Sequence, residues 1–229
     1  MVELEDRLEE MRWYEVKAEL NERRQREVWA ERKEIIPGEV LDKRILHKPI
    51  QMLELFGGLG TGMAATMKAG WRIEKWTYVE ANPRVRMMAQ HHVEILRRTY
   101  PGKILEGATK GNWGNSGHDV KEITEAQVVA WGRVDVLIAD WECQGLSRAG
   151  HGRGLEDSRS ALFEDIVRVM QLIYRLHGEY LYLLENPDFA SDPREPVRAA
   201  FQRVMSLLGA RVAMDATQAG SRSHRDRRY

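Results

Sequence analysis

Cys143 is the residue best suited to covalent chemistry in this sequence, and it is the sole cysteine among the 229 residues. It follows the largely apolar run 134–139, which predicts a strand buried on both faces of a parallel sheet and ended by Asp140. Glycines then recur between Gly145 and Gly154. Because open α/β sheets bind ligands at the carboxyl ends of their strands, the thiol is a candidate nucleophile. The alternative is a small buried residue without chemistry, which a single cysteine favours when no other motif is present.

A second motif is the glycine-rich turn LELFGGLGTG at residues 53–62. It follows a predicted strand and precedes a predicted helix, so its backbone could lie against a nucleotide-like ligand at the helix N-terminus. Glu80 ends the next predicted strand, where a carboxylate can accept hydrogen bonds from ribose hydroxyls. Glycines also form tight turns for structural reasons alone, and hydride transfer with a dinucleotide stays open on these residues. The turn lacks the lysine and Ser/Thr pair of a P-loop, which disfavours nucleoside triphosphate hydrolysis.

Predicted strands and helices alternate along most of the chain. Pro83 stands at the expected first position of one helix, and residues 107–117 are glycine-rich and irregular. The predicted strands are 51–56, 76–80, 103–106, 134–139, 180–184 and 211–216, and the predicted helices are 61–68, 83–98, 125–131, about 158–176 and about 194–208. Strands separated by helices predict an α/β fold with a Rossmann-like, doubly wound, mostly parallel sheet.

The composition agrees with a domain of this class. The chain has 43% hydrophobic residues and a formal net charge of +0, which neither supports nor excludes a polyanionic partner. One cysteine excludes an intramolecular disulfide framework and a cysteine-rich zinc site, and we predict no metal site. No apolar run approaches the roughly 20 residues that span a membrane, and the N-terminus lacks a signal-peptide core. We therefore expect an intracellular protein without a membrane partner.

The charge distribution divides the chain into two predicted regions. Residues 1–48 form a charged helical extension and connector, and residues 49–229 form the main domain. Glu, Arg and Lys dominate residues 1–34, where apolar residues recur at helical spacing but in no sustained heptad. We expect a solvated surface helix that carries no chemistry and is ended by Pro37 and Gly38.

A series of motifs resembles the cytosine-C5 DNA methyltransferases, over about residues 52–229. In chain order the motifs are LELFGGLGTG, VEANP, HDV, ECQGLS, LEDSRSALF, LLENP and GSRSHRDRRY. Several blocks in one order are far more specific than any single block. DVKEIT and SHRDRR look most like the de novo type of the family, whereas CQGLS and LEDSRSALF look more like the bacterial type. The resemblance implies the class I S-adenosylmethionine-dependent methyltransferase fold and methyl transfer to C5 of cytosine in DNA.

The resemblance assigns catalytic roles to Cys143, Glu185, Asn186 and Arg225. A Cys143 thiolate would add to C6 of the base, which makes C5 electron-rich enough to take a methyl group. Glu185, beside Asn186 at the tip of a predicted strand, would protonate or hydrogen-bond N3, best with a raised pKa. Arg225, with Arg227 as a second candidate, would bind the base carbonyl or a phosphate. Because a stacked base cannot be attacked at C6, the chemistry requires base flipping or an unpaired substrate.

The resemblance also assigns the cofactor, S-adenosylmethionine. The residues assigned to it are Phe56, Gly58, Gly60, Glu80, Asp119, Val120 and Leu162. Glu80 would hold the ribose hydroxyls, and Asp119 with Val120 would contact the adenine. Other interpretations stay open on the residues alone. Asp119 could be an N-cap or turn residue, Glu185 could cap the next helix, and Arg227 could belong to a solvated basic cluster.

Two features depart from the family's pattern. Trp141 and Glu142 stand where the family usually has a proline just before the catalytic cysteine. The loop thereby loses the fixed φ of a proline and gains the carboxylate of Glu142. If this carboxylate points inward, its negative charge disfavours the Cys143 thiolate. After Tyr229 nothing corresponds to the family's target-recognition region or to its last two blocks. We therefore expect either a fragment or a second polypeptide that supplies those parts, with DNA as the substrate.

Two other functions stay open on the sequence. The first is a catalytically impaired, methyltransferase-like regulatory or partner subunit, which Trp141, Glu142 and the short C-terminus favour. The second is another Rossmann-type enzyme, including a methyltransferase that acts on RNA or another substrate. The expected compartment is the cytoplasm for a prokaryotic or viral protein and the nucleus for a eukaryotic one.

Overall fold

Four parallel strands form the sheet around which the chain folds. The computed structural model describes residues 48–113, 118–147, 150–187 and 189–208. The strands are β1 (Ile50–Leu55), β2 (Ile73–Val79), β3 (Val136–Asp140) and β4 (Leu181–Glu185), in the order β2-β1-β3-β4. Every pairing among them is parallel. The chain forms β2 on one side of β1 and later places β3 on the other side, which makes a topological switch point between β1 and β3.

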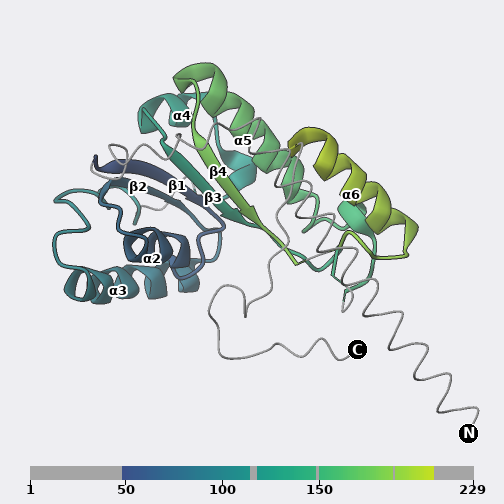
Figure 1. Ribbon diagram of the computed structural model, residues 1–229, viewed down its shortest axis with the longest axis horizontal. Coiled ribbons are helices and arrows are strands. Elements are labelled where there is room, and N and C mark those ends of the chain that lie inside the picture. The colour runs from purple at the N-terminus through teal and green to yellow at the C-terminus, as the bar shows by residue number, and fades with distance from the viewer. Residues whose placement is uncertain (1–47, 114–117, 148–149, 188, 209–229) are drawn as a thin grey trace, which may run out of the picture. The chain divides into compact units, whose positions relative to one another are not determined.

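Helices cover both faces of the sheet, as Figure 1 shows. α2 (Thr61–Lys68) and α3 (Pro83–Thr99) lie on one face, and α4 (Glu125–Trp131) and α5 (Leu162–His177) lie on the other. α6 (Glu195–Leu208) packs into the apolar cluster of the α5 face, and the short 3₁₀ helices η2 (Val120–Glu122) and η3 (Gly154–Glu156) lie in the connections. The predicted α/β, doubly wound fold is confirmed. Within the described part of the chain, no helix combines the length and apolar character needed to cross a membrane.

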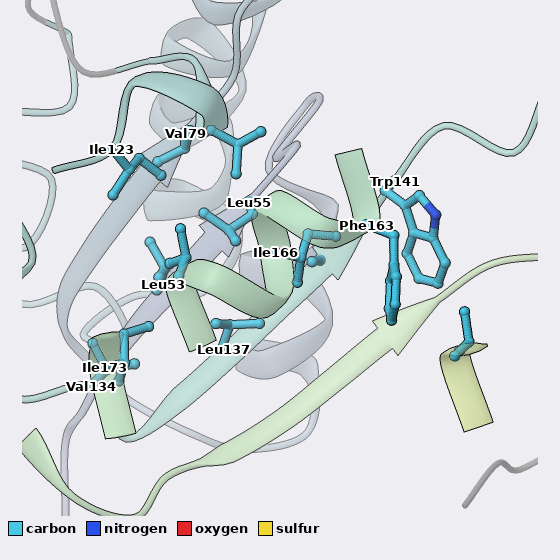
Figure 2. Packing of buried hydrophobic residues seen from close by; sticks show 14 of the residues in the cluster. Leu53, Leu55, Val79, Ile123, Val134, Leu137, Trp141, Phe163, Ile166 and Ile173 are labelled. Atoms are coloured by element: carbon cyan, nitrogen blue, oxygen red, sulfur yellow. The ribbon is translucent and has the colours of Figure 1, made fainter. Parts of the chain in front are cut away.

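Alternate strand residues feed two separate apolar clusters. Leu53 and Leu137 are fully buried on the α5 face, where they pack in one cluster with Phe163 (Figure 2). Met52 and Trp76 belong to the cluster on the opposite face, together with buried residues of α2 and α3. Burial of both faces is the reason that the strands of a parallel sheet need nearly continuous apolar runs.

Local capping signals set where the helices start. The Asn82 side chain accepts a hydrogen bond from the Arg84 backbone N–H at 3.0 Å, and a proline occupies the first position of α3. Thr124 and Gln127 form a capping box at the start of α4. α4 accordingly has its predicted bounds, and α3 ends within one residue of its prediction. α2 also has its predicted bounds, although no side chain caps its start.

Two predictions about local structure are wrong. Residues 103–106 do not form a strand, because they pair with β2 only through an isolated bridge between Ile104 and Ile73. Turns follow at once, with Gly107 at a φ of 75°, and these end the pairing. The helix expected from about residue 158 begins only at Leu162. Ser160, just before it, instead forms hydrogen bonds to the loop that follows β3 and carries Cys143, called the cysteine loop here.

Some predictions fall on residues that the structure does not describe. These are the helix at 1–34, with nearly all of the predicted region 1–48, and the strand at 211–216. Residues 114–117 of the irregular glycine-rich segment also lie outside the described part.

The packing of α2 against the sheet can be tested with Met67→Ala. Met67 is 1% exposed in the cluster of the α2 face. The substitution should lower the free energy of unfolding by about 2–5 kcal/mol, because it removes buried surface and leaves a cavity. Met87→Ala in α3 is the matched control, since Met87 is 67% exposed, and it should change that free energy by less than about 0.5 kcal/mol. Urea denaturation followed by circular dichroism measures both, and equal effects would contradict this packing.

Candidate active site

A cavity lies at the carboxyl ends of the strands, at the switch point between β1 and β3. Its volume is about 410 Å³, within the range of about 300–1,000 Å³ that is usual for small-molecule and cofactor sites. Residues assigned to the cofactor line it from several elements, and Cys143 lines it as well. The assigned residues among them are Phe56, Glu80, Asp119, Val120 and Leu162. Gly58 and Gly60 are not among the lining residues.

Gly58 and Gly60 instead shape the turn that leaves β1. Both have left-handed backbone conformations, with φ values of 51° and 76°. Phe56 also has a positive φ, 54°, which is uncommon for a residue with a bulky side chain and marks backbone strain at the cavity wall. The Tyr78 hydroxyl donates a 2.6 Å hydrogen bond to the Gly58 carbonyl, which ties the turn to β2.

Glu54 lies behind the glycine turn and is 3% exposed. Its carboxylate accepts hydrogen bonds from the backbone N–H groups of Gly62 (2.8 Å) and Met63 (3.2 Å) and from Trp76 Nε1 (2.8 Å). The two backbone groups belong to the first turn of α2, where a negative charge is favourable. Burial nevertheless raises the pKa of Glu54 to about 7, although these donors lower it. Glu54 was not among the predicted site residues. The feature of the sequence that could have identified it is a carboxylate inside an apolar strand.

Glu80 joins the glycine turn to the end of β2. Its Oε2 accepts a hydrogen bond from the Gly58 backbone N–H at 3.2 Å, and its Oε1 accepts one from the Asn82 backbone N–H at 2.8 Å. A carboxylate offers about four acceptor sites, so it can still accept hydrogen bonds from a ligand hydroxyl in the cavity. The predicted ribose contact therefore stays compatible with the geometry.

Asp119 has the capping role that the sequence left open and also lines the cavity. Its Oδ1 accepts a hydrogen bond from the Lys121 backbone N–H at 3.0 Å, at the start of η2. Val120 follows it on the same cavity wall and is buried in the core below. Asp119 and Val120 therefore both border the cavity in which a ligand would bind, and Asp119 also caps η2.

Cys143 lies half-buried on the cavity wall in a loop held from beneath by Ser160. The fully buried Ser160 hydroxyl accepts a hydrogen bond from the Gly145 N–H at 3.0 Å and donates one to the Glu142 carbonyl at 3.2 Å. The Cys143 carbonyl accepts a bond from the Ser147 N–H at 2.7 Å, which closes a turn around the thiol. One buried hydroxyl therefore fixes the backbone on both sides of the nucleophile.

Arg194 holds the far part of the same loop. Its guanidinium donates to the carbonyls of Ser147 (2.9 Å) and Gly150 (3.1 Å). It also pairs with the buried Asp192 at 2.7 Å. Ser160 and Arg194 were not predicted, because their partners are backbone atoms at least 15 residues away, which no local pattern reveals. Asp192 was not predicted either, although its partner Arg194 lies two residues away.

The motif LEDSRSALF, which contains Asp157 and Arg159, packs against the cysteine loop. The Arg159 guanidinium donates to both carboxylate oxygens of the buried Asp157 at 3.0 Å, and this pairing lowers the pKa of Asp157 to about 2. A side chain at Gly145 would approach Asp157 Cβ to 2.6 Å and the Gly154 carbonyl oxygen to 2.5 Å. The loop therefore requires glycine there for close backbone packing.

Trp141 and Glu142 occupy different environments despite being adjacent. Trp141 is 4% exposed and packs on Phe163 of α5, with ring centroids 5.4 Å apart (Figure 2). Glu142 is exposed, and its charge interacts with the Arg159 guanidinium. The carboxylate that the sequence places before Cys143 is therefore not buried against the thiol.

Glu185 ends β4 directly opposite Asp140, the last residue of β3. Partial burial and a hydrogen bond to Asp140 raise the pKa of Glu185 to about 7. The neighbouring Asn186 amide donates to the Trp141 carbonyl at 2.8 Å, so it ties the end of β4 to the cysteine loop. Arg225 and Arg227 lie outside the described residues.

These features agree with a comparison of the whole sequence to protein families. A family model described as C-5 cytosine-specific DNA methylase matches residues 50–195. That segment contains the glycine turn, Cys143 and Glu185. The chain belongs to this family. Its parallel sheet with helices on both faces is consistent with the S-adenosylmethionine-dependent methyltransferase fold of the family.

Shorter segments match curated members of the same group of enzymes. The chain is 29% identical over 79 residues to the type II methyltransferase M.NlaIV of Neisseria lactamica, an alignment that covers 34% of this chain and 15% of that protein. It is also 29% identical over 85 residues to the type II methyltransferase M1.ScrFI of Lactococcus lactis subsp. cremoris, which covers 35% of this chain and 21% of that protein. The aligned segments thus span a small part of these relatives.

Ser160→Ala tests whether the buried hydroxyl holds the cysteine loop. The change leaves the Gly145 N–H and the Glu142 carbonyl without this partner, so the free energy of unfolding should fall by about 1–3 kcal/mol. Cys143, the sole cysteine of the chain, should then react faster with a thiol reagent such as DTNB. Ser158→Ala changes an exposed serine nearby and should alter neither measurement. Unchanged thiol reactivity in Ser160→Ala would contradict this role.

Glu54→Gln tests the buried carboxyl behind the turn. A carboxyl with a raised folded-state pKa keeps its proton in the folded chain while the unfolded chain loses it, which destabilises the fold as pH rises. The stability of the wild type relative to Glu54→Gln should therefore fall between about pH 4.5 and 7 and then level off. The slope should not exceed about 1.4 kcal/mol per pH unit. Denaturant titrations at several pH values measure it, and a flat difference would refute the raised pKa.

Proposed function

We propose that this chain methylates C5 of cytosine in DNA, with Cys143 as the nucleophile and Glu185 as the acid at N3 of the base. The observation that carries the proposal is the edge formed by β3 and β4. Asp140 and Glu185 face each other in register there, and Cys143 follows β3 on the wall of the cavity. Addition to C6 with protonation at N3 needs a thiol and a neutral acid on neighbouring elements beside a cofactor-sized cavity.

The residues around the cavity fit S-adenosylmethionine as the cofactor. Carboxylates of Glu80, Asp119 and Asp140 line it, which suits a ligand that carries a sulfonium and an ammonium group. Glu80 would hold the ribose hydroxyls, while Asp119 and Val120 would contact the adenine. Phe56 brings the start of the glycine turn to the cavity wall, whereas Gly58 and Gly60 do not line the cavity. When bound, the cofactor supplies the methyl group from its sulfonium.

The protein side of the reaction begins with the thiolate of Cys143. It forms a bond to C6, the electron pair of the C5=C6 bond shifts to C4=C5, the pair of the C4=N3 bond shifts to N3, and N3 takes the proton of Glu185. C5 is then nucleophilic enough to accept the methyl group. Loss of the C5 hydrogen as a proton re-forms the C5=C6 bond and expels the thiolate, while Glu185 recovers the proton from N3. The raised pKa of Glu185 supports this role, because the acid keeps its proton near neutral pH.

Two further residues are assigned positioning and binding roles in this proposal. Asn186 orients the strand end that carries Glu185, through its bond to the Trp141 carbonyl. Arg225 would bind the base carbonyl or a phosphate through its guanidinium donors. The reaction also requires that the target base be flipped out of the stack or unpaired, because C6 is otherwise inaccessible.

The description of the matching family supports DNA as the substrate class. Both compared enzymes are named type II methyltransferases, and the segments that align cover only 15% and 21% of their lengths. We propose that selection of a DNA sequence by this protein depends on residues other than the described ones, on this or on a second polypeptide. The cavity wall is rich in carboxylates, so binding of the phosphate backbone needs basic groups from elsewhere.

Covalent trapping tests the proposed chemistry. DNA in which 5-fluorocytosine replaces every cytosine avoids any assumption about the target site. With S-adenosylmethionine it should give a denaturant-resistant adduct with the wild type, because fluorine at C5 cannot leave as a proton does. Cys143→Ala should abolish the adduct on a denaturing gel, whereas Met87→Ala, far from the cysteine in sequence and exposed, should preserve it.

The outcomes separate this proposal from its alternative. Binding of S-adenosylmethionine by calorimetry without any adduct would refute the catalytic proposal. That result would favour a methyltransferase-like regulatory subunit, the alternative that Trp141 and Glu142 favour in the sequence. An adduct that survives Cys143→Ala would refute the assignment of the nucleophile.

A further inference from the structure

We propose that Asp140 is a positioning residue that holds the catalytic proton on Glu185 through a carboxyl–carboxylate hydrogen bond. The catalytic meaning of this inference rests on the function proposed above, whereas the proton-holding role concerns the free protein. Asp140 ends β3, and the residue opposite it in β4 is Glu185. This neighbour gives Asp140 a role beyond ending the strand.

The register of the sheet fixes the pair. β3 and β4 are parallel, and their last paired residues are Asp140 and Glu185. Parallel neighbours in register lie about 4.8 Å apart, so two carboxyl groups at these ends are within reach of each other. Both side chains remain open to solvent at the strand ends, and Asp140 lines the cavity that Cys143 also lines. Glu185 is not among the residues that line the cavity, so Asp140 connects the acid to the cavity wall.

Two carboxyl groups that share a hydrogen bond must share a proton. If both were ionised they would repel each other, so the contact is favourable only while one of them is protonated. We place the shared proton on Glu185, because the hydrogen bond to Asp140 raises the pKa of Glu185. Partial burial acts in the same direction and is the larger cause of the raised pKa.

The other charges around the cavity do not oppose this arrangement. Most ionisable groups on its wall are acidic, and of the described residues Asp140 supplies the charge that acts on Glu185. The Arg159 guanidinium beneath the loop is engaged by Asp157. The remaining ionisable groups of the wall are Glu80 after β2, His118, Asp119 and Lys121 before α4, and Glu142 and Cys143 after β3.

The pair gives the acid a reversible cycle. Glu185 transfers its proton to N3 as the Cys143 thiolate adds to C6, which leaves two carboxylates facing each other. Their repulsion favours return of the proton from N3 to Glu185 when the thiolate is expelled, so no proton is gained or lost at Glu185 over the cycle. Asp140 thereby makes Glu185 both a proton donor near neutral pH and an effective acceptor at the end.

The test measures the pKa of Glu185 directly in the folded protein. Glutamate labelled with ¹³C at the side-chain carboxyl reports each titration by NMR, and Glu185→Gln identifies the signal. Glu185 of the wild type should titrate with a midpoint near pH 7. Asp140→Asn should lower the midpoint of Glu185 by about one pH unit or more. Glu142→Gln removes the same formal charge from the same loop without touching Glu185, and it should leave the midpoint within about 0.3 units. Asp140→Gly provides a second variant if Asp140→Asn fails to fold.

A second measurement links the pair to chemistry. The rate of adduct formation with 5-fluorocytosine DNA, divided by the ionised fraction of Cys143 that alkylation measures at each pH, should fall above about pH 7 in the wild type. In Asp140→Asn this falling limb should move to lower pH by the same amount as the NMR midpoint, which a merely structural effect would not produce. An unchanged Glu185 midpoint in Asp140→Asn would overturn this inference while leaving the proposed function intact. A shifted midpoint without any adduct in the wild type would support the proton-holding pair and refute the proposed function.

Discussion

The parallel pairing of β3 with both β1 and β4 is the constraint on which the site depends. It brings the carboxyl ends of these strands to one edge, so the glycine turn, the cysteine loop and Glu185 come from distant parts of the sequence to the same place. Leu53 lies opposite Leu137 in this register, and both are buried in one cluster with Phe163, so the packing of the core favours this register. The core therefore determines where the thiol and the acid lie.

The cysteine loop itself is held by polar contacts rather than by apolar packing alone. Glycines leave its backbone with few side chains of its own, and buried groups from neighbouring segments compensate. Ser160 bonds both sides of Cys143, and Arg194 bonds two carbonyls further along. Because each buried polar group is costly to leave unpaired, these contacts favour a single loop conformation. A nucleophile needs such a fixed support to meet its substrate in the right geometry.

The departures from the family's pattern have separate physical consequences. Trp141 fills a buried position against Phe163, so it supports the loop through packing. Glu142 points to solvent, where its charge is screened. Asp140, which precedes them at the end of β3, is the residue that reaches the acid, because it shares a hydrogen bond with Glu185. A carboxylate in contact with a catalytic acid changes the proton affinity of that acid, whereas the same charge on a side chain that does not contact the acid has little effect.

Much of this protein could be predicted from its sequence. Apolar runs, capping residues and glycines gave the strand and helix alternation, since these signals act within a few residues along the chain. The motif order gave Cys143, Glu185 and the cofactor residues, of which most line one cavity. The isolated bridge at Ile104 was mistaken for a strand, because local apolar character does not tell whether a partner strand continues. Only the tertiary structure decided the roles of Glu54, Ser160, Arg194 and Asp140, since each acts on atoms far away in the sequence. Burial and strand register, which set hydrogen bonding and proton affinity, exist only once the chain is folded.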